Sequence, residues 1–392
     1  MSYIPPQGFG GGAGAGGITK LSELTIDVDK DWLGYIIKNL GAPVDPTDSA
    51  RFQDIRRGET IYVAPGNSKN KDQADYVCDG TADEAEISTA LDDLPTSGGV
   101  VKLLDGDLYF SEKLTILRGN FIIEGVPGAT RIHLDTDYPF QIGDGVTALQ
   151  NIGFVNLIFD NTVSGIWFYG GSEYRIENVI IDKCRFLNTG NYGLRLYYVD
   201  QFRISNVYAV DVYNFIYPER AFNGIICNSF IDVISTSYSA IYGGDLFNTT
   251  ITQNRIRHAI YTLYNVDLRK CVIAFNWMNV NGIIYDIFRE VSDTVIACNV
   301  YSNYSSVTTS SINLDKTTTY RNIIALNTIY GGNGVAFGGN YNIVLGNVIL
   351  NSNEYSIYEK SDSDYNLILG NITDGDIVLN GEHTVFSPIS IF

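Results

Sequence analysis

Short apolar runs rich in β-branched residues recur through the C-terminal two-thirds of the chain, and most of them end at an asparagine. Examples are residues 174–178 (YRIEN), 295–299 (VIACN) and 323–327 (IIALN). Successive asparagines of this kind lie 20 to 28 residues apart. A repeat of this length is too short for a domain, and it predicts a solenoid in which each repeat forms one coil. The ten asparagines are Asn156, Asn178, Asn206, Asn228, Asn254, Asn276, Asn299, Asn327, Asn347 and Asn371.

Asparagine has two properties that suit a recurring position in a coil. It tolerates the left-handed backbone conformation that a corner between strands requires. Coils stacked ~4.8 Å apart would also let successive side-chain amides hydrogen-bond to one another, as in cross-β ladders. The alternative is that asparagine is simply a common turn residue. The regular recurrence favours an all-β chain, a right-handed parallel β-helix solenoid, with the handedness taken from the general rule for parallel crossovers.

The same pattern divides the chain into three parts. Residues 1–17 form a glycine-rich leader, which is typical of a flexible tether. Residues 18–60 are predicted to form a small N-terminal anchor segment. Residues 61–392 are predicted to form the parallel β-helix.

A helix is predicted just before the coils begin. Thr81 and Glu84 have the spacing of a capping box, and apolar residues follow them at helical intervals. Strand-like runs come next at residues 100–104, 108–110 and 121–125.

This order of elements, over residues 75–125, resembles the N-terminal signature of the pectate-lyase-like β-helix superfamily, which is also found in phage tailspikes. The resemblance implies an N-terminal capping helix over the open end of the solenoid, which would otherwise expose a strand edge. It does not imply lyase activity. Residues 39–51 (NLGAPVDPTDSAR) resemble a short element common in viral tail-fibre proteins. That second resemblance implies a virion or tail component bound through residues 1–60.

Charge and cysteine content narrow the partners. The formal net charge of −18 disfavours nucleic acid and leaves cations, basic surfaces or neutral glycans. The five cysteines form no CxxC pair, so we expect no zinc site, no other metal and no cofactor. The sequence shows no signal peptide and no uninterrupted apolar run of membrane-spanning length. We therefore expect no membrane insertion, and the resemblances imply a location on a virion or extracellular surface.

Positions counted back from each asparagine predict which side chains face outward. The second and fourth positions are mostly apolar and should point inward, so the third should point outward. In later coils this third position holds a β-branched residue, and strands apolar on both faces are usually buried on both faces. We therefore expect self-association here, and the tailspike resemblance implies a homotrimer. The alternatives are a covering loop of the same chain, or a bulge that turns the column into the core. The expected interface residues are Ile225, Ile251, Ile273, Ile296, Ile324, Val344 and Ile368.

A second recurring element consists of a small, an aliphatic and then a large residue. Residues 165–167 (GIW), 193–195 (GLR), 240–242 (AIY) and 259–261 (AIY) follow it, and Tyr217 ends a run in the same register. Stacked coils would bring the large residues into one outward column. Aromatic rings and a planar guanidinium suit the faces and hydroxyl groups of sugars. The alternative is ordinary stacking between coils without a ligand. The expected glycan-binding residues are Trp167, Arg195, Tyr217, Tyr242 and Tyr261.

Aspartates recur about four residues after several of the asparagines, and His258 takes the next place in that series. In one column, carboxylates one coil apart would be ~5 Å apart and those two coils apart ~9–10 Å. These values bracket the separations in retaining and inverting glycosidases. The alternative is that aspartate is common in turns after strands. The sequence contains neither a Gly-His-Gly triplet nor an Arg-x-Pro-x-x-Arg motif, which are sharper signatures of enzymes in this superfamily. The candidate catalytic residues are Asp160, Asp182, Asp211 and Asp232.

Taken with the resemblances, these patterns favour a virion-associated tail fibre or spike protein that binds cell-surface polysaccharide of a host. A polysaccharide-degrading glycoside hydrolase or lyase is one alternative, and a cellular surface adhesin is another. Whether the chain is an enzyme is left open by the sequence.

Overall fold

The computed structural model describes residues 60–387 except for 135–137, 161, 234–238, 258–260, 265, 281–284, 287–289, 304–309 and 315–318. The described residues belong to one compact unit, Arg56–Phe392. The glycine-rich leader and the anchor segment up to residue 59 therefore lie outside the described residues. Within the described part, no helix has the length and apolar character needed to cross a membrane.

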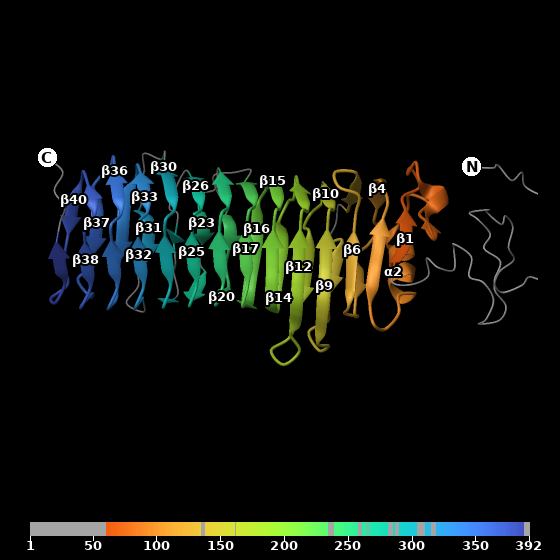
Figure 1. Ribbon diagram of the computed structural model, residues 1–392, viewed down its shortest axis with the longest axis horizontal. Coiled ribbons are helices and arrows are strands. Elements are labelled where there is room, and N and C mark those ends of the chain that lie inside the picture. The colour runs from red at the N-terminus through yellow and green to blue at the C-terminus, as the bar shows by residue number, and fades with distance from the viewer. Residues whose placement is uncertain are drawn as a thin grey trace, which may run out of the picture. The chain divides into compact units, whose positions relative to one another are not determined.

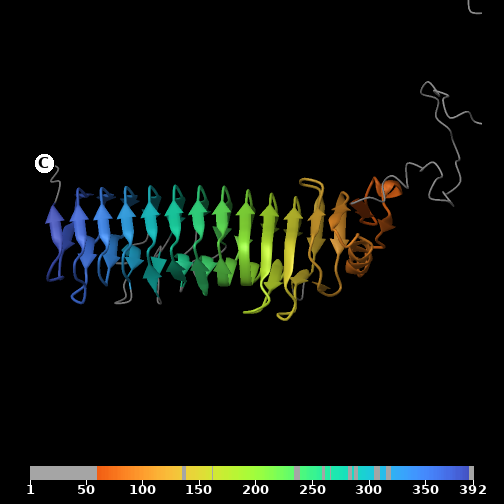
Figure 2. The same cartoon turned by 60° about the horizontal axis from the view of Figure 1, so that its bottom comes forward.

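The described chain is a parallel β-solenoid, which confirms the predicted all-β coil architecture. Strands of successive coils lie side by side along one axis (Figures 1 and 2). Each coil adds a strand to three faces, which we number in the order in which the chain visits them. Face 2 is a separate sheet of twelve described strands, whereas faces 1 and 3 belong to one sheet because β14 and β16 continue from face 3 onto face 1.

The strands of each face are as follows. Face 1 consists of β3 (Gly99–Leu103), β6 (Phe121–Glu124), β9 (Leu149–Val155), β12 (Ile176–Asp182), the end of β14 (Tyr192–Ser205), β17 (Ile225–Cys227), β21 (Thr250–Thr252), β25 (Val272–Ala274), β29 (Val295–Ala297), β32 (Ile323–Ala325), β35 (Ile343–Leu345), β38 (Leu367–Leu369) and β41 (Val385–Ser387). Face 2 consists of β4 (Gly106–Tyr109), β7 (Thr130–His133), β10 (Ile158–Asp160), β13 (Arg185–Leu187), β15 (Tyr208–Val212), β18 (Phe230–Val233), β22 (Arg255–Arg257), β26 (Trp277–Val280), β30 (Val300–Asn303), β33 (Thr328–Tyr330), β36 (Val348–Leu350) and β39 (Ile372–Thr373).

Face 3 follows face 2 along the chain in each coil. It consists of β5 (Leu114–Ile116), β8 (Phe140–Ile142), β11 (Ile166–Tyr169), the start of β14, β16 (Asn214–Phe222), β19 (Ser239–Tyr242), β23 (Tyr261–Tyr264), β27 (Tyr285–Asp286), β31 (Ser310–Leu314), β34 (Asn333–Phe337), β37 (Tyr355–Glu359) and β40 (Asp376–Val378). Short strands between faces 3 and 1 are β20 (Asp245–Phe247), β24 (Asp267–Arg269) and β28 (Val291–Ser292).

Helix α2 (Glu84–Asp92) lies beside the first strands of the described solenoid (Figure 1). It packs against β1 (Thr60–Ala64), β2 (Tyr76–Val77), β3 and β5, and a 3-10 turn, η2 (Lys71–Gln73), precedes it. The helix occurs where the sequence predicted one, but the expected capping box does not form. The carboxylate of Glu84 instead accepts hydrogen bonds from Ser111 on the next coil.

The interior of the solenoid is apolar because side chains alternate along each strand. Aromatic rings from successive coils pack on one another in the early part of the core. Phe159 and Phe186 stack with ring centroids 4.8 Å apart, and Phe140 and Phe154 lie 5.1 Å apart. All four side chains are fully buried.

Six of the ten asparagines form a buried ladder at the corner between faces 1 and 2, as predicted. The Oδ1 atom of Asn299 accepts hydrogen bonds from the backbone N–H and from Nδ2 of Asn276, both at 3.0 Å. The Nδ2 atom of Asn299 also donates to the carbonyl of Ile273 at 2.9 Å. The same pair of bonds joins each neighbouring couple. The ladder consists of Asn254, Asn276, Asn299, Asn327, Asn347 and Asn371.

The other four asparagines do not join this ladder, so the prediction of a single file of ten was wrong. Asn156, Asn206 and Asn228 lie one position earlier in the coil, at the left-handed corner itself, with φ of 59°, 55° and 52°. Asn178 lies at the opposite end of face 1, where its Nδ2 donates to Asn151 at 3.1 Å. In the later coils another residue type takes the left-handed position, and the asparagine moves one place onward into the core.

This one-residue shift also overturns the expected interface column. Of its seven residues only Ile225 is outward, with 39% of its surface exposed. The other six are core residues, because counting back from the ladder asparagines reaches the middle of each face-1 strand. The six are Ile251, Ile273, Ile296, Ile324, Val344 and Ile368, each at most 1% exposed.

Candidate functional site

A column of large side chains runs along face 3 through consecutive coils. Strand pairing sets Trp167 opposite Arg195 and Arg195 opposite Tyr217. The rings of Tyr217 and Tyr242 stack 6.1 Å apart, and Tyr242 stacks on Tyr264 at 5.6 Å. We call these five residues the face-3 strip.

The structure brings together four of the five residues expected in this column. Tyr261 is not among them, because its backbone pairs with Ser239. Tyr264, three residues later, occupies the place next to Tyr242. The triplet at 259–261 matches the recurring pattern in composition but lies out of register with it.

A second aromatic row, which the sequence reasoning missed, widens this surface. Tyr169 and Tyr197 stack with their ring centroids 5.4 Å apart, two residues beyond Trp167 and Arg195 on the same strands. The Tyr169 ring also lies 4.9 Å from that of Trp167. On the other side, Tyr192 packs against Tyr217 at 5.0 Å. Side chains two residues apart on a strand share a face, so alternate aromatic residues are the signal that could have found this row.

Arg195 lies between two rings of the face-3 strip. Its guanidinium carbon lies 4.9 Å from the ring centre of Trp167 and 5.4 Å from that of Tyr217. Its Nη2 pairs with Glu219 Oε2 at 3.2 Å. Burial by itself lowers the pKa of Arg195, but the hydrogen bond to Glu219 and the electrostatic interactions with Tyr138 and Glu219 outweigh it and raise the pKa. The strip therefore presents a charge-compensated donor between two half-buried rings.

Burial raises the pKa of Tyr192 beside this strip, and the neighbouring phenols Tyr242 and Tyr217 raise it further. The Tyr192 hydroxyl is therefore protonated at neutral pH and can both donate and accept a hydrogen bond.

The four candidate catalytic aspartates do not form one column, so that alignment was wrong. Asp160 and Asp232 share a column on face 2, but Leu187 and Val210 separate them. Asp182 lies on face 1, paired with Ser205. Asp211 sits at a bulge in β15 with φ of 55°. Strand register, which the spacing after an asparagine does not fix, decides these placements.

Two of these carboxylates are held by polar side chains of neighbouring coils. Asp160 accepts hydrogen bonds from Arg131 at 3.0 Å and from Asn188 at 3.1 Å. Asp182 accepts from Ser205 at 2.8 Å and from Asn206 at 2.7 Å. Both carboxylates therefore hydrogen-bond one coil to the next, which gives each of them a structural role.

A titratable cluster on the first coils of face 2 was also missed by the sequence reasoning. His133 Nε2 lies 3.1 Å from Asp107 Oδ1, and the ring of Tyr109 stacks on His133 at 4.9 Å. The hydrogen bond from His133 lowers the pKa of Asp107. The residues of this cluster come from two coils, so they form no local sequence motif.

Among the described residues, one group has the composition and spacing to hold a metal ion, namely Cys78, Asp83 and Glu86 beside α2. Both carboxylate oxygens of Asp83 already accept backbone N–H groups, from Gly80 at 2.9 Å and Tyr109 at 2.7 Å. Burial raises the pKa of the Cys78 thiol, and it also raises the pKa of Asp83. A protonated thiol and a carboxylate whose two oxygens each already accept a backbone N–H make this group part of the local fold.

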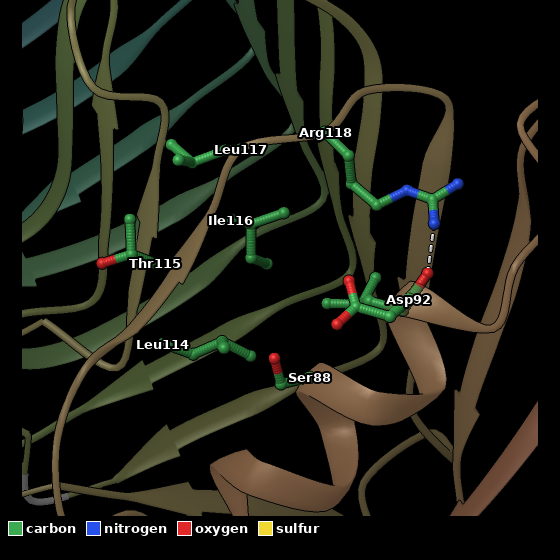
Figure 3. A pocket seen from close by; sticks show the side chains of 8 residues that line it. Ser88, Asp92, Leu114, Thr115, Ile116, Leu117 and Arg118 are labelled. Carbon is green, nitrogen blue, oxygen red and sulfur yellow. Dashed lines mark hydrogen bonds between the residues drawn. The ribbon is translucent and has the colours of Figure 1, made fainter.

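A cleft between α2 and β5 is one concave feature near this end of the solenoid (Figure 3). Arg118 spans it and donates hydrogen bonds to the carbonyls of Leu91, Leu94 and Pro95 at the end of the helix. The guanidinium of Arg118 is therefore hydrogen-bonded to the end of α2. The face-3 strip remains the surface whose chemistry points most clearly to a ligand.

The sequence matches no protein-family model and no curated protein. Solved structures do resemble the fold. A DFA-IIIase from Arthrobacter chlorophenolicus A6 in complex with GF2 superposes with a TM-score of 0.62 at 11% identity, over 78% of this chain and 93% of that one. A family 28 exopolygalacturonase from Yersinia enterocolitica gives a TM-score of 0.53 at 12% identity, over 86% of this chain and 78% of that one. The likeness shows a shared parallel β-helix fold.

Proposed function

We propose that this chain is a carbohydrate-binding β-helix whose face-3 strip holds a surface glycan. The observation that carries the proposal is the unbroken contact of aromatic rings and one guanidinium over five coils. Aromatic rings offer large, rigid apolar faces with polar tips, and they lose little conformational freedom on binding. A sugar has the complementary combination of apolar ring faces and hydroxyl groups. Because the backbone of a solenoid is rigid, the strip is already arranged before a ligand arrives, which limits the entropic cost of binding.

We further propose that the protein acts as a fibre or spike on a virion, attached through residues 1–60. Support comes from the resemblance of residues 39–51 to an element of viral tail-fibre proteins. In this arrangement α2 would cap the open end of the solenoid and protect its first strand edges from pairing.

An enzyme is the second candidate. Two structural neighbours are enzymes by name, a DFA-IIIase and an exopolygalacturonase. The dispersal of the four aspartates removes the carboxylate pair that the sequence suggested, and it favours binding without cleavage.

A glycan array with the full chain, followed by titration of the selected glycan, tests the binding proposal. Trp167→Ala is expected to weaken binding about tenfold or more, since a well-packed aromatic contact of this size typically contributes about 2 kcal/mol. Tyr330→Ala removes an exposed tyrosine from face 2 and serves as the matched control. Equal affinity of wild type and Trp167→Ala would refute the site. Release of shorter saccharides from the bound glycan would support the enzyme instead.

Most of the predicted interface column is buried, but a different column on face 1 points outward. This outward column supports a proposal of self-association. Its residues are apolar over most coils and partly exposed, with Val272 and Ile323 exposed by 38% and 37%. A partner that matches this coil spacing over many strands is most simply a second copy of the same solenoid. A homotrimer is what the tailspike resemblance implies. The column consists of Ile225, Thr250, Val272, Val295, Ile323, Ile343, Leu367 and Val385.

Light scattering coupled to size exclusion tests this assembly. Ile323→Asp places a charge on the proposed surface, and it is expected to lower the mass to that of one chain without loss of β-structure. Thr328→Asp, on face 2, is the control and should leave the mass unchanged. A wild-type protein that is already monomeric would contradict the proposal.

A further inference from the structure

A second column of arginine and aromatic side chains runs along face 2. Strand pairing places Arg185 opposite Tyr208, then Phe230, then Arg255, and finally Trp277 on five consecutive coils. No local sequence motif marks this column. We call these five residues the face-2 strip.

The side chains of the face-2 strip form a continuous stack. The guanidinium of Arg185 lies 5.2 Å from the ring centre of Tyr208, whose ring stacks on that of Phe230 at 5.1 Å and 16°. The guanidinium of Arg255 lies 4.1 Å from the ring centre of Trp277 and 5.8 Å from that of Phe230. Each guanidinium therefore lies over at least one ring of the strip. Arg185, Tyr208 and Arg255 are exposed, and the other two members are half-buried.

The face-2 strip differs from the face-3 strip in the ion pairing of its arginines. Within the described part of the chain, neither Arg185 nor Arg255 forms an ion pair with a carboxylate, whereas Arg195 on face 3 pairs with Glu219. Other arginines of the solenoid are paired as well, including Arg131, Arg175 and Arg321. The net charge of the chain is −18. Two guanidinium groups without a carboxylate partner therefore lie on one stacked column of an acidic protein.

Arg257 lies beside this strip in the adjacent outward column, opposite Asp232. Because a carboxylate faces it from the neighbouring coil, we leave Arg257 out of the anion-binding set. Arg185 and Arg255 are the two cations of the proposed site.

We propose that the face-2 strip is a second binding site, specific for an acidic polysaccharide. Planar guanidinium groups bind carboxylate or sulfate groups through paired hydrogen bonds, and the rings between them offer apolar faces to the sugar backbone. Five coils cover about 19 Å from the first side chain to the last, given a strand spacing of ~4.8 Å. Arg185 and Arg255 are three coils apart, about 14 Å at that spacing, so an extended chain with negative charges about 14 Å apart fits the order of cations and rings. The glycan bound on face 3 needs no charge, because its one arginine is already compensated.

Three forms of one polymer test this inference on the full-length chain: dextran, carboxymethyl dextran and dextran sulfate. The inference predicts binding of one or both charged forms through face 2, weakening as sodium chloride is raised, and at least tenfold weaker binding of uncharged dextran. A preference between the two charged forms would tell carboxylate from sulfate recognition. Binding of no charged form would overturn the proposal, as would tighter binding of single-stranded oligodeoxythymidylate than of either charged dextran.

Matched variants locate the site. Arg255→Gln is expected to weaken binding of the charged form at least tenfold, and Arg255→Lys, which keeps the charge but loses the planar fork, should weaken it less. Arg203→Gln removes an exposed arginine from face 1 and should change the affinity by less than twofold. Trp167→Ala on face 3 should also leave the affinity unchanged, so failure of this inference and failure of the face-3 site can be told apart. An equal loss in Arg203→Gln and Arg255→Gln would show unspecific charge attraction, and loss in Trp167→Ala alone would place the acidic glycan on face 3. Either result overturns the proposal.

Discussion

Replacement of Asn299 by glycine is expected to lower the free energy of unfolding by about 2–6 kcal/mol. The side chain is 1% exposed and lies in the middle of the buried asparagine ladder. Without it, the backbone N–H of Asn276 loses its acceptor, and the carbonyl of Ile273 loses a donor. A buried polar group left without a partner costs about 1–3 kcal/mol, and two groups are affected. Equilibrium unfolding in urea, followed by circular dichroism, measures the change.

The same substitution at Asn228 is the matched control. Asn228 is exposed, has φ of 52° and occupies the left-handed corner one position before the ladder. Glycine adopts that conformation without steric cost, so Asn228→Gly should change the free energy of unfolding by no more than about 1 kcal/mol. Similar losses at the two positions would mean that the ladder bonds contribute little and that asparagine serves only as a corner residue.

Substitution of Gly244 by alanine is expected to destabilise the solenoid by at least about 3 kcal/mol, more than the left-handed conformation alone would cost. Gly244 has φ of +71° and lies at the corner that follows Tyr242 of the face-3 strip. A β-carbon there would overlap the carbonyl oxygen of Pro218 and lie 2.6 Å from its carbonyl carbon. Both obstacles are backbone atoms of the preceding coil, so two coils would have to move apart.

Gly128 separates the steric term from the conformational one. Its φ of +72° is nearly the same, but no atom lies within 4 Å of a β-carbon built on it. Gly128→Ala should therefore cost only about 1–2 kcal/mol, the usual penalty for a left-handed residue with a side chain. Thermal and urea unfolding of both variants give the comparison. Equal destabilisation would show that close approach of the coils at Gly244 does not matter.

The repeat architecture could be predicted from the sequence because its signals are local. Apolar residues alternate within each short strand, and a corner follows each strand, so the period survives without knowledge of the register. The register itself was not predictable. Asn228 and Asn254 end similar runs, yet the first is an exposed corner residue and the second a buried ladder residue. When the asparagine stands one residue later in the coil, counting back from it reaches strand positions that face the opposite way. A column predicted from the asparagine then lies in the core instead of on the surface.

The candidate site was also predictable only where its signals are local and do not depend on register. The triplets ending at Trp167, Arg195 and Tyr242 could be aligned because each occupies equivalent places in its strand. Tyr264 was missed because the loops between faces 2 and 3 differ in length from coil to coil. The face-2 strip has no local motif at all, since its members differ in type and lie 22 to 25 residues apart. Such a column becomes visible only when the strands are paired.

Titration calorimetry with a length series of the glycan selected on the array would test most directly whether side chains of successive coils act as one binding surface. If they do, affinity should rise with each added sugar until the ligand covers the face-3 strip, about 19 Å at a strand spacing of ~4.8 Å, and then level off. Tyr264→Ala, at the far end of the strip, should weaken the long ligands and leave the shortest ones that still bind at the Trp167 end unaffected. An affinity that is the same from the shortest ligand to the longest would contradict the account.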